Sequence, residues 1–504
     1  MTRKDYLCSC KKQGSLFYSN AMKRIAITTF ALLFTLAVFG QGSDDACLFS
    51  QTYYQGTAKS LGMGNALGAV GGDMTSVCIN PAGLGIYRSN EFTTTVNLLD
   101  NHARSTYYGT SNGANQMRLS IPNVGYVSTK QKSNYRNLRF TQFGIGLTRT
   151  NDYNTHAFAR GINPTSSKID DYLAQIDGFS ESDIQDAFPY TIYPAWNTYL
   201  IDIYQDQQGE YYGSPVPQGN IWQGQESEFK GRSEEWTFVG SANYAERLFL
   251  GISANLGHIK RVGYRNLKEE AREGDDTPFN EWSFREDLSS NGLGGSLKVG
   301  MIYHASPVVR IGAAFHSPTI YSIDEAWQTQ TESKINLITR KYVSPESNYE
   351  YTFISPLKWV GSLAFVIGYQ GLISLDAEYI NYGAAQFRAN DWDYSDVNQS
   401  IKATYGRTFN FRLGSEWRIG SSYLRMGAGY YGSPFGLGKT GGSVKKASCG
   451  ISVPVSYDSS FDFAYELSYG KTYRYLYDAG ELGIEPVTQN SFRHVFATTL
   501  KVRF

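Results

Sequence analysis

The sequence has few of the features by which soluble enzymes and disulfide scaffolds are usually recognised. Its 504 residues include only five cysteines and 15 prolines. Cys8 and Cys10 lie in or before the N-terminal apolar segment, which leaves an odd set, Cys47, Cys78 and Cys449, and excludes a disulfide scaffold. The 46 basic and 46 acidic side chains cancel, and no basic run follows the N-terminal region. Nucleic acid is therefore not an expected partner.

Long apolar runs are also missing, apart from one near the N-terminus. Residues 25–39 are apolar, follow Met22-Lys23-Arg24 and precede the small residues that begin at Gly40. This run is too short to cross a bilayer, so residues 1–40 are predicted to be a presequence and signal peptide, cleaved after Gly40, with Met22 as an alternative start. No cysteine follows directly, which argues against a lipid anchor. An exported chain without an apolar helix can cross a membrane only with strands.

Aromatic residues and two-residue alternation are abundant. The chain has 38 Tyr, 28 Phe, 8 Trp and 51 Gly. At the C-terminus, Phe496, Thr498, Leu500, Val502 and Phe504 share one strand face, and Thr499, Lys501 and Arg503 share the other. A final strand of this kind, ending in an aromatic residue, is typical of outer-membrane β-barrels, although a β-sandwich strand can alternate similarly. The signal peptide favours the barrel.

The spacing of the strands extends this prediction along the chain. About fourteen candidates centre on 92–100, 117–128, 137–150, 234–245, 247–265, 282–304, 308–328, 349–367, 370–388, 403–419, 421–432, 445–457, 460–476 and 491–504. Short turns alternate with longer inserts at 101–116, 152–232, 266–281, 329–348, 389–402, 433–444 and 477–490. Short periplasmic turns and long outer loops are the asymmetry of an outer-membrane barrel. We therefore expect an all-β, transmembrane antiparallel barrel over 91–504, in the outer membrane of a Gram-negative bacterium.

The insert 152–232 is predicted to be extracellular and to contain helices. Ser167 is a plausible N-cap, and apolar residues recur after it at helical spacing. Two interpretations stay open. The insert either packs its own small core, or it forms an apolar vestibule where a ligand first binds, with Tyr172, Leu173, Trp196, Tyr199 and Leu200 as the contact residues.

Residues 41–90, between the signal peptide and the first strand, are rich in small residues. The glycines at 62, 64, 68, 71 and 72 lack the βαβ context of a nucleotide-binding loop, and their density suits a segment packed tightly inside a cavity. Asn80-Pro81-Ala82-Gly83-Leu84 resembles the N-terminal signature of the FadL–TodX family, outer-membrane channels for long-chain fatty acids and other hydrophobic compounds. Segments 310–319, 375–382, 412–417 and 424–434 resemble that family's strands in the expected order, and the likeness spans roughly 51–504.

The resemblance implies a fourteen-stranded barrel closed by a small N-terminal hatch in its lumen, with Asn80, Pro81, Ala82 and Gly83 in the hatch motif. It further implies passive uptake: outer loops capture a hydrophobic small molecule, a lumen site holds it, and it leaves sideways into outer-membrane lipid beside a kinked third strand. That strand corresponds to 138–150, where Gly144 or Gly146 would permit the kink. We expect a monomer.

Charged residues lie at inward-facing positions of several predicted strands. Arg310, Arg412 and Arg425 are candidates to meet a ligand carboxylate, or else to pair with acidic wall residues, namely Asp376, Glu378, Asp462 and Glu466. Both interpretations stay open at this point.

No catalytic, metal or cofactor constellation stands out. The six histidines are scattered. His304 and His316 could face each other across a turn, but two loosely placed histidines are more often polar lumen residues. We therefore predict no enzymatic activity, no metal and no cofactor. The alternative function is a barrel whose extracellular loops bind haem, host or partner proteins without transport. The hatch favours transport, and the sequence does not identify the ligand.

Overall fold

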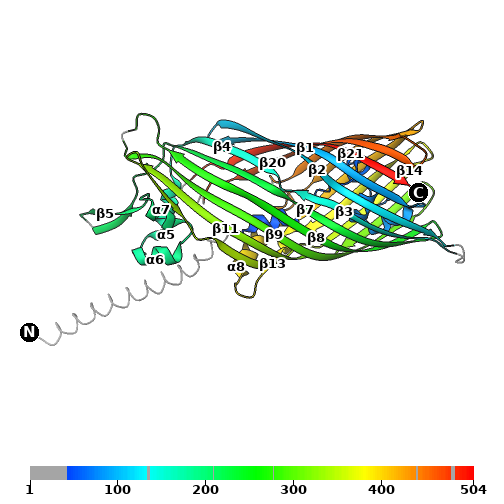
Figure 1. Cartoon of the computed structure of the whole chain (residues 1–504), viewed down its shortest axis with the longest axis horizontal. Coiled ribbons are helices and arrows are strands. Elements are labelled where there is room, and N and C mark those ends of the chain that lie inside the picture. The colour runs from blue at the N-terminus through cyan, green and yellow to red at the C-terminus, as the bar shows by residue number, and fades with distance from the viewer. Residues whose placement is uncertain (1–41, 133–136, 208, 276, 439–440, 478–482) are drawn as a thin grey trace, which may run out of the picture.

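The computed structural model describes residues 42–132, 137–207, 209–275, 277–438, 441–477 and 483–504. Within these residues a closed antiparallel barrel of fourteen strands surrounds an N-terminal helical segment (Figure 1). The predicted fold class is therefore confirmed. The predicted signal peptide and its cleavage site lie outside the described residues.

The wall consists of continuous strands and of strands in two pieces. The continuous strands are β1 (Glu91–Tyr107), β2 (Thr110–Gln131), β7 (Ile221–Tyr244), β8 (Leu248–Glu270), β9 (Phe279–His304), β17 (Arg407–Ile419), β18 (Ser422–Tyr431), β19 (Val444–Pro454), β20 (Ser459–Arg474) and β21 (Val487–Arg503). The strands in two pieces are β3 (Leu138–Asp152) with β4 (Thr155–Asn163), β10 (Val309–His316) with β11 (Ile320–Ile335), β14 (Lys358–Ile367) with β13 (Ser347–Ile354), and β15 (Gly371–Asn381) with β16 (Gln386–Arg388). β12 (Ile338–Val343) extends β11 as a hairpin, η2 (Tyr382–Ala384) separates β15 from β16, and α8 (Ser395–Thr404) precedes β17.

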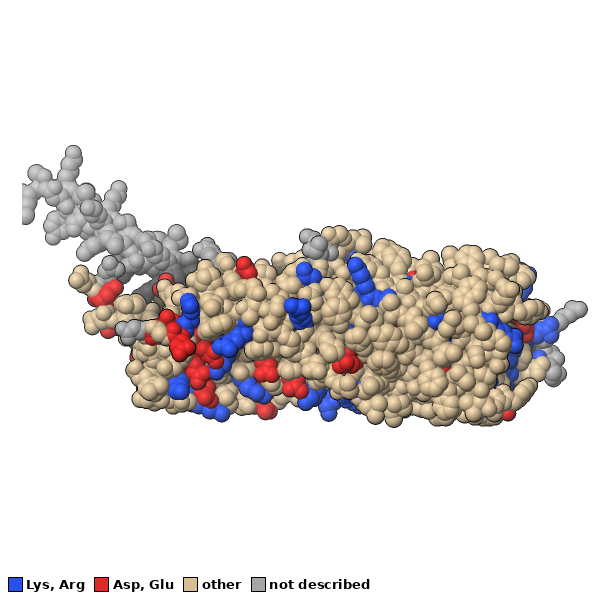
Figure 2. Space-filling model, turned by 90° about the horizontal axis from the view of Figure 1, so that it is seen from above, with Lys and Arg blue, Asp and Glu red and all other residues tan. Residues whose placement is uncertain are grey.

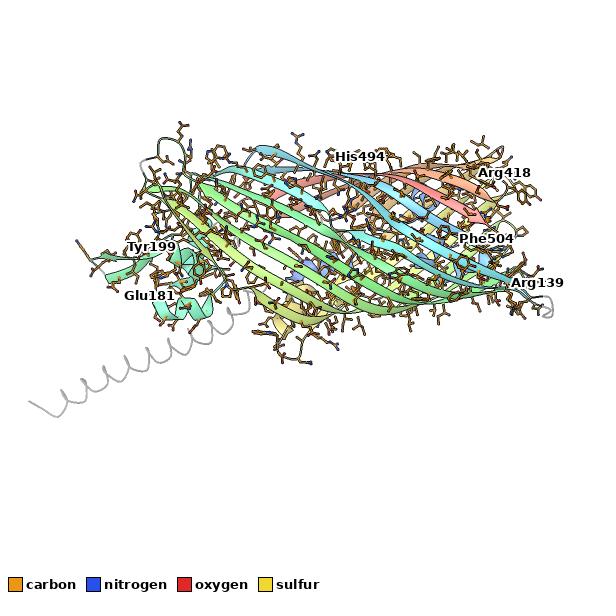
Figure 3. All side chains as sticks on the ribbon, viewed as in Figure 1. Arg139, Glu181, Tyr199, Arg418, His494 and Phe504 are labelled. Carbon is orange, nitrogen blue, oxygen red and sulfur yellow. The ribbon has the colours of Figure 1, made fainter. Side chains whose placement is uncertain are left out.

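The barrel closes where its first strand meets its last. β1 pairs antiparallel with β21, from Glu91 opposite Arg503 to Thr106 opposite Thr488. The backbones of Asn90 and Phe504 exchange two hydrogen bonds of 3.2 Å. The turns predicted at 245–246, 306–307, 369–370, 420–421 and 458–459 are short connections, and the C-terminus lies at the end of the barrel opposite the long insert (Figure 1). Figure 3 places Phe504 at that end with Arg139 and Arg418.

The exterior of the barrel carries an apolar belt. Exposed residues on alternate strand positions include Trp236, Phe238, Leu250, Ile252, Leu293, Leu297, Trp359, Phe365, Leu375, Phe411, Leu413, Phe463 and Phe496. Figure 2 shows this belt as a broad tan surface with charged side chains on either side. Alternate residues that meet hydrocarbon, with polar residues inside, are the pattern of a membrane-spanning barrel. Among the described residues, no helix has the length and apolar character needed to cross a membrane.

Several predicted strand boundaries are wrong, because the strands continue beyond the lipid. Residues 101–116, predicted to be an insert, extend β1 and β2 to a tight turn at Tyr108–Gly109, where φ is 42° and 76°. β4, β12 and the ends of β7, β8 and β9 also fall in predicted inserts. Above the membrane neither strand face needs to be apolar, so the two-residue alternation fades while the backbone hydrogen bonding persists. The predicted strand 308–328 is interrupted at Ser317-Pro318-Thr319, since proline lacks an N–H to donate.

The long insert folds into a small unit, which we call the cap (residues 164–220). It contains α5 (Lys168–Ile176), α6 (Glu181–Ala187), α7 (Ile192–Asn197) and a separate hairpin of β5 (Asp202–Asp206) and β6 (Gly209–Gly213). The predicted N-cap is present, because Ser167 Oγ accepts from the Ile169 N–H and Asp170 accepts from the Ser167 N–H. Residues of the cap and of the barrel rim form one apolar core, comprising Ile169, Tyr172, Ile176, Ile184, Ile192, Leu200, Leu267, Phe279 and Trp282 among others.

The hatch (residues 42–90) lies inside the barrel and is enclosed by its wall. It consists of α2 (Ser43–Ser50), α3 (Ala58–Gly62), α4 (Met74–Ile79) and the 3-10 helix η1 (Pro81–Ile86). α2 packs its Ala46 and Phe49 into an aromatic cluster of wall residues that includes Phe353 and Phe387. The remaining hatch helices are almost wholly buried.

Candidate ligand site in the lumen

The Asn80-Pro81 motif attaches the hatch to the wall. Asn80 Nδ2 donates to the carbonyl of Gly68 (2.8 Å) and to that of Met301 on β9 (3.1 Å), and its Oδ1 accepts from the Ala82 N–H (3.1 Å). Pro81 begins η1, where its fixed φ suits a first helical position. A Cβ on Gly300 would lie 2.0 Å from Asn80 Oδ1, and one on Gly251 would lie 2.3 Å from the Pro81 carbonyl carbon. These wall glycines allow the close approach.

The hatch also completes the edge of β3 where the neighbouring strand β2 departs. The pairing of β2 with β3 runs from Gln131 opposite Phe140 to Asn123 opposite Thr148 and then ends. Immediately beyond, the N–H groups of Tyr53 and Gln55 donate to the carbonyls of Thr150 (2.7 Å) and Arg149 (3.0 Å). A segment of the hatch therefore takes the place of β2 at this edge.

Polar side chains fill the space between β2 and β3 beyond that point. Arg149 is buried; it donates to Ser120 Oγ of β2 (2.8 Å) and to Glu234 Oε1 of β7 (3.0 Å). Arg118 of β2 donates to Asn154, which lies between β3 and β4. Since β4 pairs with β7 while β2 pairs with β1, the wall here is joined by side chains rather than by a backbone ladder.

Gly144 and Gly146, the predicted kink residues, lie in regular register opposite Val239 and Thr237. The register shifts of β3 lie instead at Leu138–Phe140 and Arg149–Asn151. A Cβ on Gly146 would lie 2.5 Å from Met74 Cε, so this glycine gives room to the hatch. A role for either glycine in bending the strand stays a prediction.

A lumen cavity of about 270 Å³ lies beside this break in the wall. It is bounded on one side by 151–153 and Thr155, at the junction of β3 and β4, and on another by Leu48, Gln51 and Tyr53 of the hatch. Three cationic side chains line it, Arg261, Lys446 and Arg493, against one acidic residue, Asp152. Tyr53, Tyr153, Leu48 and Val444 supply apolar surface. The cavity thus combines apolar walls with cations, the chemistry that suits an amphiphilic anion.

The three cations are held in different ways. Lys446 Nζ donates to Glu466 (2.8 Å) and lies 5.4 Å from the centre of the Tyr53 ring. Arg493 has no carboxylate partner among the described residues; it donates to Asn101 Oδ1 (2.9 Å) and to the carbonyl of Asp152 (3.3 Å). Arg261 donates to Asp45 of α2 (2.9 Å). Arg493 is therefore the lining cation whose charge is not neutralised by a described carboxylate and is available to a ligand.

A second cavity of about 440 Å³ shares Leu48 and Arg261 with the first. It is lined by the start of α2 and by residues of β8 and β9, including Arg265 and Glu286. Residues of α2 line both cavities, so this helix borders the open part of the lumen.

The predicted lumen charges mostly pair with one another. Arg412 lies 3.3 Å from Glu378 and 3.9 Å from Asp376, and Arg425 lies 3.3 Å from Asp462. Asp376 also accepts from the Gly68 N–H of the hatch (3.0 Å). Glu466 pairs with Lys446, and Arg310 has no ion pair among the described residues.

The predicted vestibule residues divide into two groups. Tyr172 and Leu200 are 2% and 0% exposed and belong to the core of the cap. Leu173 and Trp196 pack on that core at its edge, and Tyr199 is 54% exposed, with the Arg340 guanidinium 4.5 Å from its ring centre. Contact of these residues with a ligand stays a prediction.

Sequence reasoning missed the cavity residues Lys446 and Arg493. It also missed Arg149, which bridges β2 and β7 at the break in the wall. The two-residue alternation could have predicted an inward position for Lys446, because Lys446 falls on the strand face opposite Lys445, Ala447 and Cys449. No local sequence pattern predicts the role of Arg149, since its partners come from other strands. His304 and His316 do not face each other: His316 donates to the Ile79 carbonyl (2.9 Å), while His304 packs on Phe249.

No protein-family model and no curated protein matches the sequence, whereas solved structures match the fold. The toluene transporter TodX of Pseudomonas putida superposes with a TM-score of 0.52 and 11% identity, over 90% of this chain and 99% of that chain. A Pseudomonas aeruginosa FadL homologue gives 0.55 and 10%, over 90% and 99%. The toluene transporter TbuX of Ralstonia pickettii gives 0.50 and 14%, over 91% and 100%. The chain therefore has the fold of these transporters, a fourteen-stranded β-barrel of the outer-membrane type.

Proposed function

We propose that this protein is a non-enzymatic outer-membrane channel for the passive uptake of hydrophobic molecules that carry an anionic group, such as long-chain fatty acids. The observation that carries the proposal is the lumen cavity with Lys446 and Arg493, which lies beside the junction of β3 and β4 and is partly lined by the hatch. Solved proteins with this fold include toluene transporters and a FadL homologue, which supports a hydrophobic cargo.

The geometry suggests a route of three steps. A ligand enters the open lumen beside α2 and places its apolar part against Leu48, Tyr53, Tyr153 and Val444. Burial of that part provides about 25 cal/mol per Å² of apolar surface. Its carboxylate accepts hydrogen bonds from Arg493 and Lys446, each charge-assisted bond contributing about 1.5–3 kcal/mol. It then leaves sideways between β2 and β3, once the hatch segment at Tyr53–Gln55 releases the β3 edge.

The test compares two adjacent lysines that lie on opposite faces of β19. Lys446→Gln combined with Arg493→Gln should lower the affinity for radiolabelled dodecanoate by about tenfold or more, because two charge-assisted bonds are removed. Lys445→Gln faces outward and serves as the matched control. Binding is measured on full-length protein in nanodiscs, and uptake in proteoliposomes. Equal dodecanoate binding by the double variant and the control would refute the proposed site.

A further inference from the structure

The outer surface of the cap contains a groove distinct from the lumen. It has a volume of about 740 Å³ and lies between the α5–α6 connection and the β5–β6 hairpin. Leu173, Phe179, Ile203, Tyr211 and Tyr212 form its apolar lining. Tyr212 Oη donates to the carbonyl of Phe179 (3.0 Å), which ties the hairpin to the helices, and the Trp196 ring packs edge-on against Tyr212. The residues that form the groove are therefore held in place by packing between the β5–β6 hairpin and the helices of the cap.

Three carboxylates line this groove without partners. Asp177, Glu181 and Glu210 are exposed, and among the residues that the structure describes none donates a hydrogen bond to them or forms an ion pair with them. Other acidic residues of the cap are engaged locally: Asp170 and Asp183 accept from the N-terminal N–H groups of α5 and α6. The unpaired negative charge is thus concentrated at the groove, where Figure 3 marks Glu181.

The whole cap carries the same sign of charge. Residues 164–220 contain nine acidic residues and a single basic residue, Lys168. The Lys168 ammonium lies 4.8 Å from the centre of the Tyr172 ring, and burial lowers its pKa. It does not line the groove. An anionic ligand of the lumen would be repelled by this surface, so the groove requires a different occupant.

We propose that the groove binds a small organic cation with an apolar body, and specifically a primary or quaternary amine. The three carboxylates attract a positive charge, and the faces of Tyr211 and Tyr212 attract a cation electrostatically. Leu173, Phe179 and Ile203 bury the apolar body. The volume lies in the range of small-molecule sites. This site is separate from the proposed transport function.

The test uses three ligands with one apolar body and different charges: 4-phenylbutylamine, 4-phenylbutanol and 4-phenylbutyrate. On full-length protein in nanodiscs, equilibrium dialysis should show the amine bound at least about tenfold more tightly than the alcohol, with the acid weakest. Asp177→Asn with Glu181→Gln and Glu210→Gln should remove this preference for the amine. Tyr211→Ala should weaken binding of the amine several-fold.

Asp186→Asn is the matched control, since Asp186 is an exposed cap carboxylate outside the groove. It should leave amine binding unchanged, as should Lys446→Gln with Arg493→Gln in the lumen. The substitutions lie on an exposed surface, and heat-modifiable migration verifies folding. Equal binding of the three ligands, retention of the amine by the triple variant, or equal loss in Asp186→Asn would each overturn the proposal.

Discussion

The lumen cavity and the cap groove have similar apolar linings but opposite charge. Arg261, Lys446 and Arg493 line the former, and Asp177, Glu181 and Glu210 line the latter. A formal net charge of zero over the chain conceals this separation. If both proposals hold, the two sites select ligands of opposite sign, and an anion on its way to the lumen does not bind first in the cap groove. Charge placement, rather than total charge, carries the functional information.

The largest expected effect is a reversal of charge in the lumen. Arg493→Glu places a carboxylate near Asp152, and like-charge repulsion should weaken dodecanoate binding by about a hundredfold or more. Binding of 4-phenylbutylamine to the cap should not change. Parallel dialysis of both ligands on one protein sample makes the comparison. Loss of binding of both ligands would indicate misfolding. Unchanged binding of both would show that Arg493 does not contribute to the lumen site.

The second effect separates the cap from the barrel. Buried Glu269 accepts hydrogen bonds from the side chains of Ser167, Gln223 and Trp282 and from the Lys168 N–H. Glu269→Ala leaves these buried donors unsatisfied, which should destabilise the cap by about 2–4 kcal/mol. Limited proteolysis should then cleave 164–220, and amine binding should fall while dodecanoate binding persists.

Glu270→Ala is the matched control for that experiment. Glu270 is the neighbouring residue, faces outward and forms half-exposed ion pairs with Arg160 and Lys268. Exposed ion pairs contribute little to stability, so the cap of the Glu270→Ala variant should resist proteolysis. Equal protection of the cap in both variants would show that Glu269 does not anchor it.

The third effect concerns the hatch, which forms part of the lining of the lumen cavity. Asn80→Ala with Pro81→Ala removes the bonds to Gly68 and Met301 and the fixed φ at the start of η1, at a cost of about 1–3 kcal/mol. The barrel should still fold, dodecanoate uptake by proteoliposomes should change, and amine binding should not. Unchanged uptake in a folded double variant would remove the motif from the transport route.

The smallest effect distinguishes the two sites by ionic strength. The groove carboxylates are exposed, and the Debye length falls from about 10 Å at 0.1 M salt to about 3 Å at 1 M. Amine binding should therefore weaken several-fold over this range, whereas dodecanoate binding to the buried Lys446 and the partly buried Arg493 should weaken less. An equal salt dependence would contradict the difference in burial on which the comparison rests.

The architecture was predictable because a lipid-facing strand must alternate. Phe496 to Phe504 shows this period, and the same rule would have placed Lys446 inward had it been applied there. Above the lipid the rule fails, so the extension of β1 and β2 over 101–116 was missed. The break beside Arg149 depends on pairing between strands distant in sequence, and no local pattern encodes that pairing. Helical spacing correctly predicted α5 around Tyr172. It does not distinguish a helix face that packs in a core from one that contacts a ligand.

The most direct test of the central claim is the position of a bound anionic amphiphile. Crystals of the full-length protein soaked with 12-bromododecanoate would locate its bromine by anomalous scattering and its carboxylate by density. The account predicts the carboxylate within hydrogen-bonding distance of Arg493 or Lys446, with the chain along Leu48 and Tyr153. Density only in the cap groove, or an empty lumen at saturating ligand, would contradict it.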